Sequence, residues 1–288
     1  MLEHLNTLPK LSERVLILGG SGFIGQKIIE KLSHKTESIV SLGSKNLDLT
    51  SPDSVEKLKK IFNKSDTVIF LSAITPDKGK NIATFTKNIL MMQHFIDAIK
   101  TSPVAHIIYL SSDAVYGLDQ SYISEESPVA PESLYGVMHL SREIMLSEVN
   151  EIPHAILRLT MVYGKGDTHF AYGPNRFYDS ALMNKTIEIF GNGEEYRDYI
   201  HIDDLVSIIE KIICLKSVGL INIASGVSST FNDIANKIVN NVSHTIEIVK
   251  NKRINEIKHK HFNITKLIKA FPSISIRSME IGITEYSK

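Results

Sequence analysis

A short apolar run that ends in a glycine turn is the feature that most constrains the fold of this chain. Residues 15–18 are all large and aliphatic, Gly19, Gly20 and Ser21 follow, and a helical pattern begins at Phe23. Continuous apolar runs of this length are typical of buried parallel strands. Because the turn has almost no side chains, backbone N–H groups at the start of the helix are open to an anion, which the helix dipole favours. The sequence therefore predicts a loop that cradles a pyrophosphate.

The three spaced glycines of this loop are expected to have different structural roles. Gly19 and Gly22 would allow the turn and the close approach of a ligand, and Gly25 would allow tight contact between helix and strand. An ordinary strand–turn–helix connection is the alternative, but apolar residues at helical spacing after the turn favour the binding loop. The candidate loop residues for a dinucleotide are Gly19, Ser21, Gly22, Phe23, Ile24 and Gly25.

Composition excludes several classes of protein. The 288 residues suffice for one large or two modest domains, and 32 basic residues balance 32 acidic ones, so no charge excess favours nucleic acid or an anionic membrane. No apolar run is long enough to span a bilayer, and the first residues lack a signal-peptide pattern. Cys214 is the single cysteine, so disulfides within the chain are excluded. We expect it to be a small core residue. A cytoplasmic location fits these observations.

No metal-ligand cluster is expected either. The 11 histidines are scattered, and His259 and His261 lie in a lysine-rich stretch that we interpret as a solvated surface.

Strands and helices alternate along the first half of the chain. This repetition predicts an α/β fold with a doubly wound parallel sheet, whose strands end at one edge where ligands bind. The expected strands are 15–18, 38–42, 67–71, 105–111 and 155–159, and the expected helices are 23–33, 52–63, 81–100 and 134–149. Further on we expect a loop at 165–175, helices at 176–184, 203–215 and 231–242, strands at 187–190 and 220–224, and a mixed tail from 245. Asp203 is the expected N-cap of one of these helices, and Ser229 or Thr230 that of another.

Two further motifs carry groups suited to acid–base chemistry. Ser111 and Ser112 follow an apolar strand, so their hydroxyls are expected at the ligand edge of the sheet. Tyr135 and His139 lie four residues apart in a helical pattern, which places both side chains on one face. A phenol beside a proton-carrying ring can exchange a proton with a carbonyl or an alcohol.

Together these stretches resemble the extended short-chain dehydrogenase/reductase family, which comprises nucleotide-sugar epimerases, dehydratases and 4-keto reductases. Further matching stretches are 158–164, 191–204 and 222–226, and the resemblance covers about residues 13–242. It implies a Rossmann domain formed by residues 1–164 and 197–226, with a smaller C-terminal substrate-binding domain formed by 165–196 and 227–288. It also implies a homodimer through the helices expected at 81–100 and 134–149.

The resemblance implies roles for individual residues. Tyr135 would be the catalytic acid/base, Ser112 would polarise the substrate oxygen, and His139 would take the place of the family's lysine, which holds the cofactor. Arg197 would bind the nucleotide diphosphate of the substrate, and Asn175 is expected beside it. The remaining expected cofactor contacts are Asp48 and Leu49 at the adenine, Leu71, Ser72 and Ala73 along the cleft, and Asn88 on a supporting helix.

Two departures from the family pattern concern the chemistry. Bringing a tyrosine pKa from about 10 to 7 needs about 4 kcal/mol of differential stabilisation, which a charged lysine helps to supply. A histidine at 139 is mostly neutral at pH 7, so we expect a slower and more pH-dependent enzyme, or one that has lost this reaction. Met161 stands where relatives commonly have an asparagine that contacts substrate, so the identity of the substrate transfers less well than the fold.

The second expected strand ends in Gly43, Ser44 and Lys45, without the acidic residue that binds the ribose of NAD. Ser44 and Lys45 could accept a 2′-phosphate instead, so the sequence favours NADP over NAD.

Asp113 is followed by Ala114, so the stretch after Ser112 supplies only one acid, which counts against a dehydratase.

The sequence therefore predicts hydride transfer at C4 of a nucleotide-activated sugar, as a reductase or an epimerase. The alternative is a catalytically weakened NAD(P)-binding relative that acts as a sensor or scaffold, for which His139 and Met161 are the support.

Overall fold

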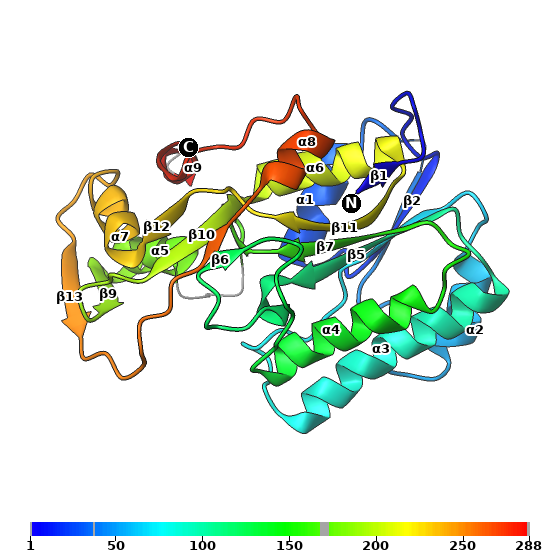
Figure 1. Cartoon of the computed structure of the whole chain (residues 1–288), viewed down its shortest axis with the longest axis horizontal. Helices are drawn as coiled ribbons and strands as arrows, with labels where there is room; N and C mark the ends of the chain where they lie inside the picture. Colours follow the sequence, from blue (N-terminus) through cyan, green and yellow to red (C-terminus); the bar gives the residue numbers. More distant parts are fainter. Residues whose placement is uncertain (1, 37, 168–172, 287–288) are drawn as a thin grey trace.

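The computed structural model describes residues 2–36, 38–167 and 173–286, and its centre is a seven-stranded sheet (Figure 1). The strands lie in the order β1-β11-β7-β5-β4-β2-β3, and all are parallel except β1 at the edge. Their bounds are β1 Glu3–His4, β2 Arg14–Leu18, β3 Ser38–Leu42, β4 Thr67–Phe70, β5 His106–Ser112, β7 His154–Leu159 and β11 Ser217–Ile223. The strand order reverses between β2 and β4, which is the position where doubly wound sheets bind ligands.

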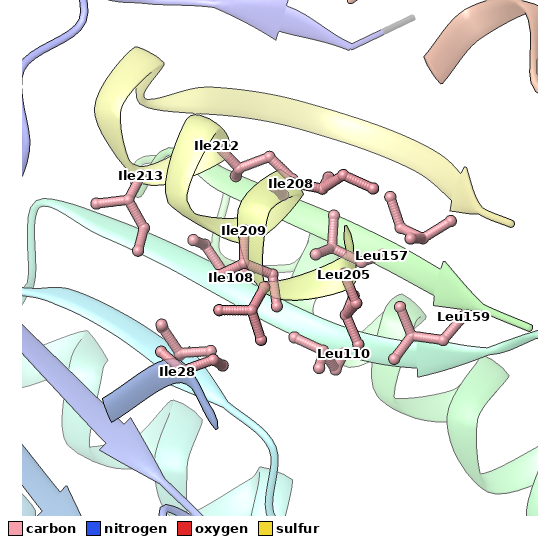
Figure 2. Packing of buried hydrophobic residues seen from close by; sticks show 14 of the residues in the cluster. Ile28, Ile108, Leu110, Leu157, Leu159, Leu205, Ile208, Ile209, Ile212 and Ile213 are labelled. Carbon is pink, nitrogen blue, oxygen red and sulfur yellow. The ribbon is translucent and has the colours of Figure 1, made fainter. Parts of the chain in front are cut away.

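Helices cover both faces of this sheet, as the predicted doubly wound fold requires. In Figure 1, α1 (Phe23–Leu32) and α6 (Ile202–Leu215) lie on one face, and α2 (Ser54–Ile61), α3 (Ile82–Thr101) and α4 (Leu134–Ser147) lie on the other. Figure 2 shows the isoleucines of α6 packed on β5 and β7, where Ile208, Ile209 and Ile212 are fully buried. Each such side chain contributes about 1.5–3 kcal/mol on burial. The predicted α/β fold is confirmed.

A smaller lobe with its own apolar core lies beside the main sheet (Figure 1). Phe177, Ile189, Phe231 and Ile234 are buried together there. The lobe contains α5 (Pro174–Asn184), β9 (Thr186–Phe190), α7 (Phe231–Val239), β13 (Glu247–Asn251) and α9 (Met279–Tyr286). The division of the chain into two domains at the residues named above stays a prediction.

Short strands connect the two parts. β10 (Tyr196–His201) lies between β8 (Met161–Tyr163) and β12 (Ser228–Thr230), and β14 (His261–Phe262) pairs with β6 (Tyr122–Ile123). The short helix α8 (Thr265–Ala270) follows β14 and contributes Leu267 to the main core. Within the described ranges, none of the helices is both long enough and apolar enough to cross a membrane.

The structure corrects several local expectations. α6 begins at Ile202, and His201 caps it by accepting a hydrogen bond from the Asp203 backbone at 3.3 Å, because β10 runs directly into the helix. Asp203 is therefore in the first turn and is not the N-cap. Thr230 does cap α7, in a capping box with Asp233, but the helix ends at Val239 rather than at 242. Residues 168–172 of the expected loop lie outside the described residues.

The expectation of a solvated surface at His259 and His261 is confirmed only in part, because residues 254–257 before them are exposed. Both rings are partly buried and lie 5.4 Å from the ring of Tyr196, and Lys260 between them is only 5% exposed. These ring contacts join parts of the chain far apart in sequence, so composition alone does not reveal them. Cys214 is a free thiol that is half-buried, so it is not part of the fully buried core.

Candidate active site

The glycine turn after β2 packs too closely for side chains at two positions. Gly19 has a φ of +95°, and a Cβ there would lie 2.9 Å from the backbone nitrogen of Ser72. At Gly25, a Cβ would lie 2.6 Å from the Cα of Gly20. The first position requires a backbone conformation that favours glycine, and the second requires contact between the helix and the turn without a side chain.

The first turn of α1 has the donors that a pyrophosphate needs. Its N-cap is Gly22, which has no side chain to bond the first backbone N–H groups, and the turn contains no acidic residue. Backbone N–H groups at a helix start lack partners within the helix, so here they stay available to an anion. The turn therefore fits the pyrophosphate of a nicotinamide dinucleotide.

A cleft of about 350 Å³ extends from this turn to the start of α4. Nearly all the cofactor residues expected from the sequence line it: Gly19, Ser21, Gly22, Phe23, Ile24, Gly25, Ser44, Asp48, Leu49, Leu71, Ser72, Ala73, Tyr135 and His139. The carboxylate of Asp48 accepts two hydrogen bonds from Thr50, which lower its pKa. Fourteen residues from separate segments thus meet in one cavity.

Two expected cofactor residues are not in the cleft wall. Lys45 is exposed beside it. Asn88 is buried in α3, where its amide accepts from the backbone nitrogen of Ile74 at 2.8 Å and donates to the carbonyl of Ile74 at 3.0 Å. Asn88 therefore fixes the loop after β4 that lines the cleft.

The start of α4 brings Tyr135 next to Ser112. A Cβ on Gly136 would lie 2.1 Å from the carbonyl oxygen of Ala114, so only glycine lets the helix approach this short 3₁₀ turn (Asp113–Val115). Burial and the charge of Asp113 raise the pKa of Tyr135 to about 12, while Arg142 and a hydrogen bond with Ser112 oppose the rise. Tyr135 therefore carries its proton at neutral pH.

His139 lies behind Tyr135, and the two rings meet edge to face with centroids 4.6 Å apart. Its Nδ1 is 2.7 Å from the hydroxyl of Tyr109, whereas Nε2 has no hydrogen-bond partner among the residues that the structure describes. Burial and the charge of Arg142 hold the pKa of His139 well below its usual value. The ring is therefore neutral at pH 7.

Sequence analysis missed Arg142, a buried cation one turn beyond His139. Its Nε donates to the backbone oxygen of Asn88 at 2.9 Å, and a terminal nitrogen donates to the backbone oxygen of Ser72 at 2.9 Å. The guanidinium lies 5.3 Å from the centroid of the Phe70 ring. Across the described ranges, no carboxylate forms an ion pair with it. Its place on the buried face of a helix, next to the Tyr135 motif, was the available signal.

A buried ion pair supports the same end of β5. Arg158 donates to Glu143 through Nε at 3.0 Å and through a terminal nitrogen at 2.7 Å, and both side chains are less than a tenth exposed. Ser111 donates to Glu143, and Arg158 donates to the hydroxyl of Tyr116 at 3.0 Å. This network joins α4 to β5 and β7 directly below Ser112.

The residues expected on the substrate side have partners within the protein. Arg197 forms an ion pair with Glu195 and donates to the backbone oxygen of Lys258. Asn175 accepts from the backbone nitrogen of Gly164 at 3.0 Å. Neither lines the cleft, so a substrate would have to exchange these contacts for its own.

Asp113, which follows Ser112, is paired with a residue from the C-terminal part of the chain. The ammonium of Lys260 lies 3.3 Å from the Asp113 carboxylate and 3.3 Å from its backbone oxygen. Lys260 is buried, so this ion pair packs the C-terminal part of the chain against the 3₁₀ turn.

One group of potential metal ligands does come together, contrary to the sequence expectation of none. His201, Asp203 and Glu285 offer ligand atoms within 4.8 Å of one another in the described part of the chain. The guanidinium of Arg277 pairs with Asp203 at 3.8 Å and with Glu285 at 3.2 Å. Because arginine stays charged, it already neutralises these carboxylates and disfavours a cation there.

Comparisons with known proteins agree with this geometry. Residues 15–224 match the family model described as NAD dependent epimerase/dehydratase family. The chain is 27% identical over 232 residues to a protein of Bacillus subtilis named an uncharacterized UDP-glucose epimerase, covering 69% of this chain and 72% of that one. It is 29% identical over 225 residues to GDP-6-deoxy-D-talose 4-dehydrogenase of Aggregatibacter actinomycetemcomitans, covering 74% and 75%.

Among solved structures, the UDP-glucose 4-epimerase of Thermus thermophilus in complex with NAD superposes with a TM-score of 0.81 at 20% identity, covering 95% of this chain and 97% of that one. This likeness shows a shared fold. The family model spans the glycine turn, Tyr135 and His139, so the resemblance expected from the sequence is confirmed. The chain belongs to the NAD dependent epimerase/dehydratase family.

Proposed function

We propose that this protein catalyses hydride transfer at C4 of a nucleotide-activated sugar, with Tyr135 as the acid/base. The observation that carries the proposal is that Tyr135 and His139 line the same cleft as the glycine turn. Relatives named for epimerase or 4-dehydrogenase activity on UDP- or GDP-linked sugars support the substrate class and the position.

The residues of the cleft divide the reaction between them. A nicotinamide cofactor, when bound along the glycine turn, supplies or accepts the hydride. Ser112 lies behind the cleft wall next to Tyr135, whose pKa it lowers, and would hold the reacting sugar oxygen. Because its pKa is raised to about 12, Tyr135 keeps its proton and can donate it to a keto oxygen. Ketone reduction needs such a donor, and epimerisation includes the same step as its second half.

Dehydration fits the site less well. It would call on the carboxylate after Ser112 as an acid, and Asp113 is held in an ion pair with Lys260 at 3.3 Å. Ala114 supplies no second acid. We therefore place the chain with the reductases and epimerases of its family.

NADP is the proposed cofactor, with NAD as the alternative. Ser44 lies in the cleft wall at the end of β3, Lys45 is exposed beside it, and no acidic residue between 42 and 45 would repel a 2′-phosphate. Titrating the protein with NADPH and with NADH under identical salt conditions tests this preference. Tighter binding of NADH would contradict it.

The test of the activity is a spectrophotometric assay with a panel of nucleotide-linked 4-keto sugars and reduced nicotinamide. A Tyr135→Phe variant should lose about 10²- to 10⁴-fold in turnover, because it removes the proton donor, while cofactor binding is retained. If the wild-type protein turns over no member of the panel, or if the variant keeps full rate, the proposal is wrong.

A second candidate is a cofactor-binding sensor or scaffold with weakened chemistry. The neutral state of His139 favours it, since no charged group stands at that position. Intact cofactor binding without turnover across the panel would support this candidate over the first.

A homodimer in the cytoplasm is the proposed setting. Leu134, Val137 and Ile144 on α4 and Leu90 on α3 are large apolar side chains that remain 36–57% exposed, on helices that pack together. A second copy that covers α3 and α4 would bury them. Light scattering at micromolar concentration should give twice the chain mass, and a monomer would contradict this arrangement.

A further inference from the structure

We propose that Arg142 supplies the fixed positive charge of this reacting centre, and that Tyr109 holds His139 as the neutral tautomer with its proton on Nε2. The role of this arrangement in catalysis rests on the proposed function, but the tautomer and the charge can be tested without it. Both Tyr109 and Arg142 would then be positioning residues: Tyr109 acts through His139, and Arg142 acts by its charge on the surrounding rings.

The hydrogen bond between Tyr109 and His139 sets the tautomer. The Tyr109 hydroxyl lies 2.7 Å from Nδ1. Burial raises the pKa of Tyr109 well above its usual range, so the phenol keeps its proton. Burial also keeps His139 uncharged. The contact with Nδ1 is the one hydrogen bond in which the Tyr109 hydroxyl can donate its proton among the described residues, so we infer that the hydroxyl donates and the lone pair of Nδ1 accepts. The imidazole hydrogen is then on Nε2.

Nε2 is the atom left for a ligand. It is buried and without a hydrogen-bond partner among the described residues, and His139 is part of the cleft wall. A buried donor without a partner is destabilising, and a ligand acceptor would remove that penalty. The ligand that fits is a hydroxyl or carbonyl oxygen of the molecule held by the glycine turn, such as a ribose hydroxyl of the nicotinamide nucleotide.

Arg142 is the cation that acts on all three rings. Its donors are directed to backbone oxygens of Asn88 and Ser72 rather than to a carboxylate. A guanidinium stays charged when buried, so its field is not cancelled at the site. The charge lowers the pKa of Tyr135 and of Tyr109, and it opposes protonation of His139.

The other charged groups near these rings are accounted for. Asp113 and Asp77 raise the pKa of Tyr135, and Glu143, which is paired with Arg158, raises that of Tyr109. Of the groups named, Arg142 alone makes the tyrosines more acidic by its charge. The pH dependence of the reaction should therefore follow Tyr135, and should contain no step from His139 near its usual pKa of about 6.5. This reverses the expectation from the sequence.

Nitrogen NMR of the cofactor-free protein labelled in its histidines tests the first half. A His139→Gln variant identifies the resonances of His139. We expect chemical shifts of an Nε2-protonated neutral ring that stay constant between pH 5.5 and 8. Tyr109→Phe removes only the hydroxyl, and it should shift His139 towards a mixture of tautomers. Tyr116→Phe, which alters an equally buried tyrosine outside this contact, should leave the His139 resonances unchanged.

Two substitutions at Arg142 test the second half. In Arg142→Met, His139 should take up a proton at higher pH than in the wild-type protein, whereas Arg142→Lys keeps the charge and should restore the wild-type behaviour. In the assay, Tyr109→Phe should lower kcat/KM and cofactor affinity by roughly three- to tenfold, the loss of one hydrogen bond. If Arg142→Met does not fold, Arg142→Lys and Tyr109→Phe still decide the question.

Three results would overturn the proposal. They are an Nδ1-protonated ring, a His139 that titrates between pH 6 and 7 in the wild-type protein, and a tautomer unaffected by Tyr109→Phe. Absence of turnover with every sugar would count against the proposed reaction alone, because the nitrogen spectra are recorded without substrate.

Discussion

The buried pair of Glu143 and Arg158 gives the most direct quantitative prediction for stability. In Glu143→Gln the guanidinium of Arg158 stays buried and loses its counter-charge, with only the hydroxyl of Tyr116 at 3.0 Å and a neutral amide as partners. Removing one partner of a buried pair costs about 3–5 kcal/mol, because the remaining charge is not solvated. The variant should also weaken the attachment of Ser111, which donates to the same carboxylate.

The magnitude follows from how completely the pair is buried. The side chains of Arg158 and Glu143 are 7% and 6% exposed, and two nitrogens of the guanidinium contact the carboxylate at 3.0 and 2.7 Å. Little of the Coulomb attraction is therefore screened by water. For a chain of this size, a loss of 3–5 kcal/mol corresponds to a fall in Tm of roughly 5–10 °C. The double variant Glu143→Gln/Arg158→Met should be more stable than the sum of the two single changes by at least about 1 kcal/mol.

Denaturant unfolding followed by circular dichroism measures these differences. Glu56→Gln is the matched control, since Glu56 and Lys59 form a pair at 2.8 Å on the exposed face of α2. Water screens that pair, so the control should unfold almost as the wild-type protein does. If Glu143→Gln is no more destabilising than Glu56→Gln, or if the single effects simply add, the argument from burial is wrong.

Two further changes probe other parts of the fold. Gly25→Ala should weaken NADPH binding at least tenfold in a fluorescence titration, because the new Cβ would lie 2.6 Å from the Cα of Gly20 in the turn; unchanged affinity would contradict the tight packing there. Burial raises the pKa of the Asp198 carboxyl to about 6, above its unfolded value of about 3.9. The folded protein therefore binds this proton more tightly than the unfolded chain does. The resulting contribution to the free energy of unfolding is fully present at low pH and is lost as pH rises from about 4 to 6. Asp198→Asn should lack this decline of up to about 3 kcal/mol in unfolding experiments across that window, and a parallel decline in both proteins would refute it.

The parts of the fold that the sequence predicted are those with a local physical signal. The strand β2, the glycine turn and α1 each have a pattern of apolar residues or glycines within a few positions, and all three occur as predicted. Thr230 and Asp233 likewise form a capping box that is visible as a short motif. Fourteen of the sixteen expected cofactor residues meet in one cleft because parallel strands bring their carboxyl ends to one edge.

The parts that escaped prediction depend on partners far apart in the chain. Lys260 reaches Asp113 across 147 positions, and nothing near either residue marks the contact. Arg158 begins one of the matching stretches and Glu143 lies in an expected helix, but their pairing depends on how α4 packs on β7. The burial of Arg142 against α3 and the loop after β4 is likewise a property of the tertiary structure, which its position in a helix only hints at.

Position 139 shows how this limit affects a functional argument, and it yields a last prediction. From the sequence, His139→Lys should restore a missing cation and speed the reaction. In the structure, a lysine there would bury a second positive charge near Arg142, in a site where the neighbouring side chains Tyr109 and Tyr135 are neutral. Two buried like charges without a carboxylate cost several kcal/mol or force one to lose its proton.

We therefore expect His139→Lys to lower both the Tm and the turnover of the protein. The double variant His139→Lys/Arg142→Met, which leaves one cation, should recover part of both. Thermal unfolding and the pH profile of turnover measure the two effects together. A single variant as stable as the wild-type protein, with a double variant no better, would mean that Arg142 does not supply the charge of this site.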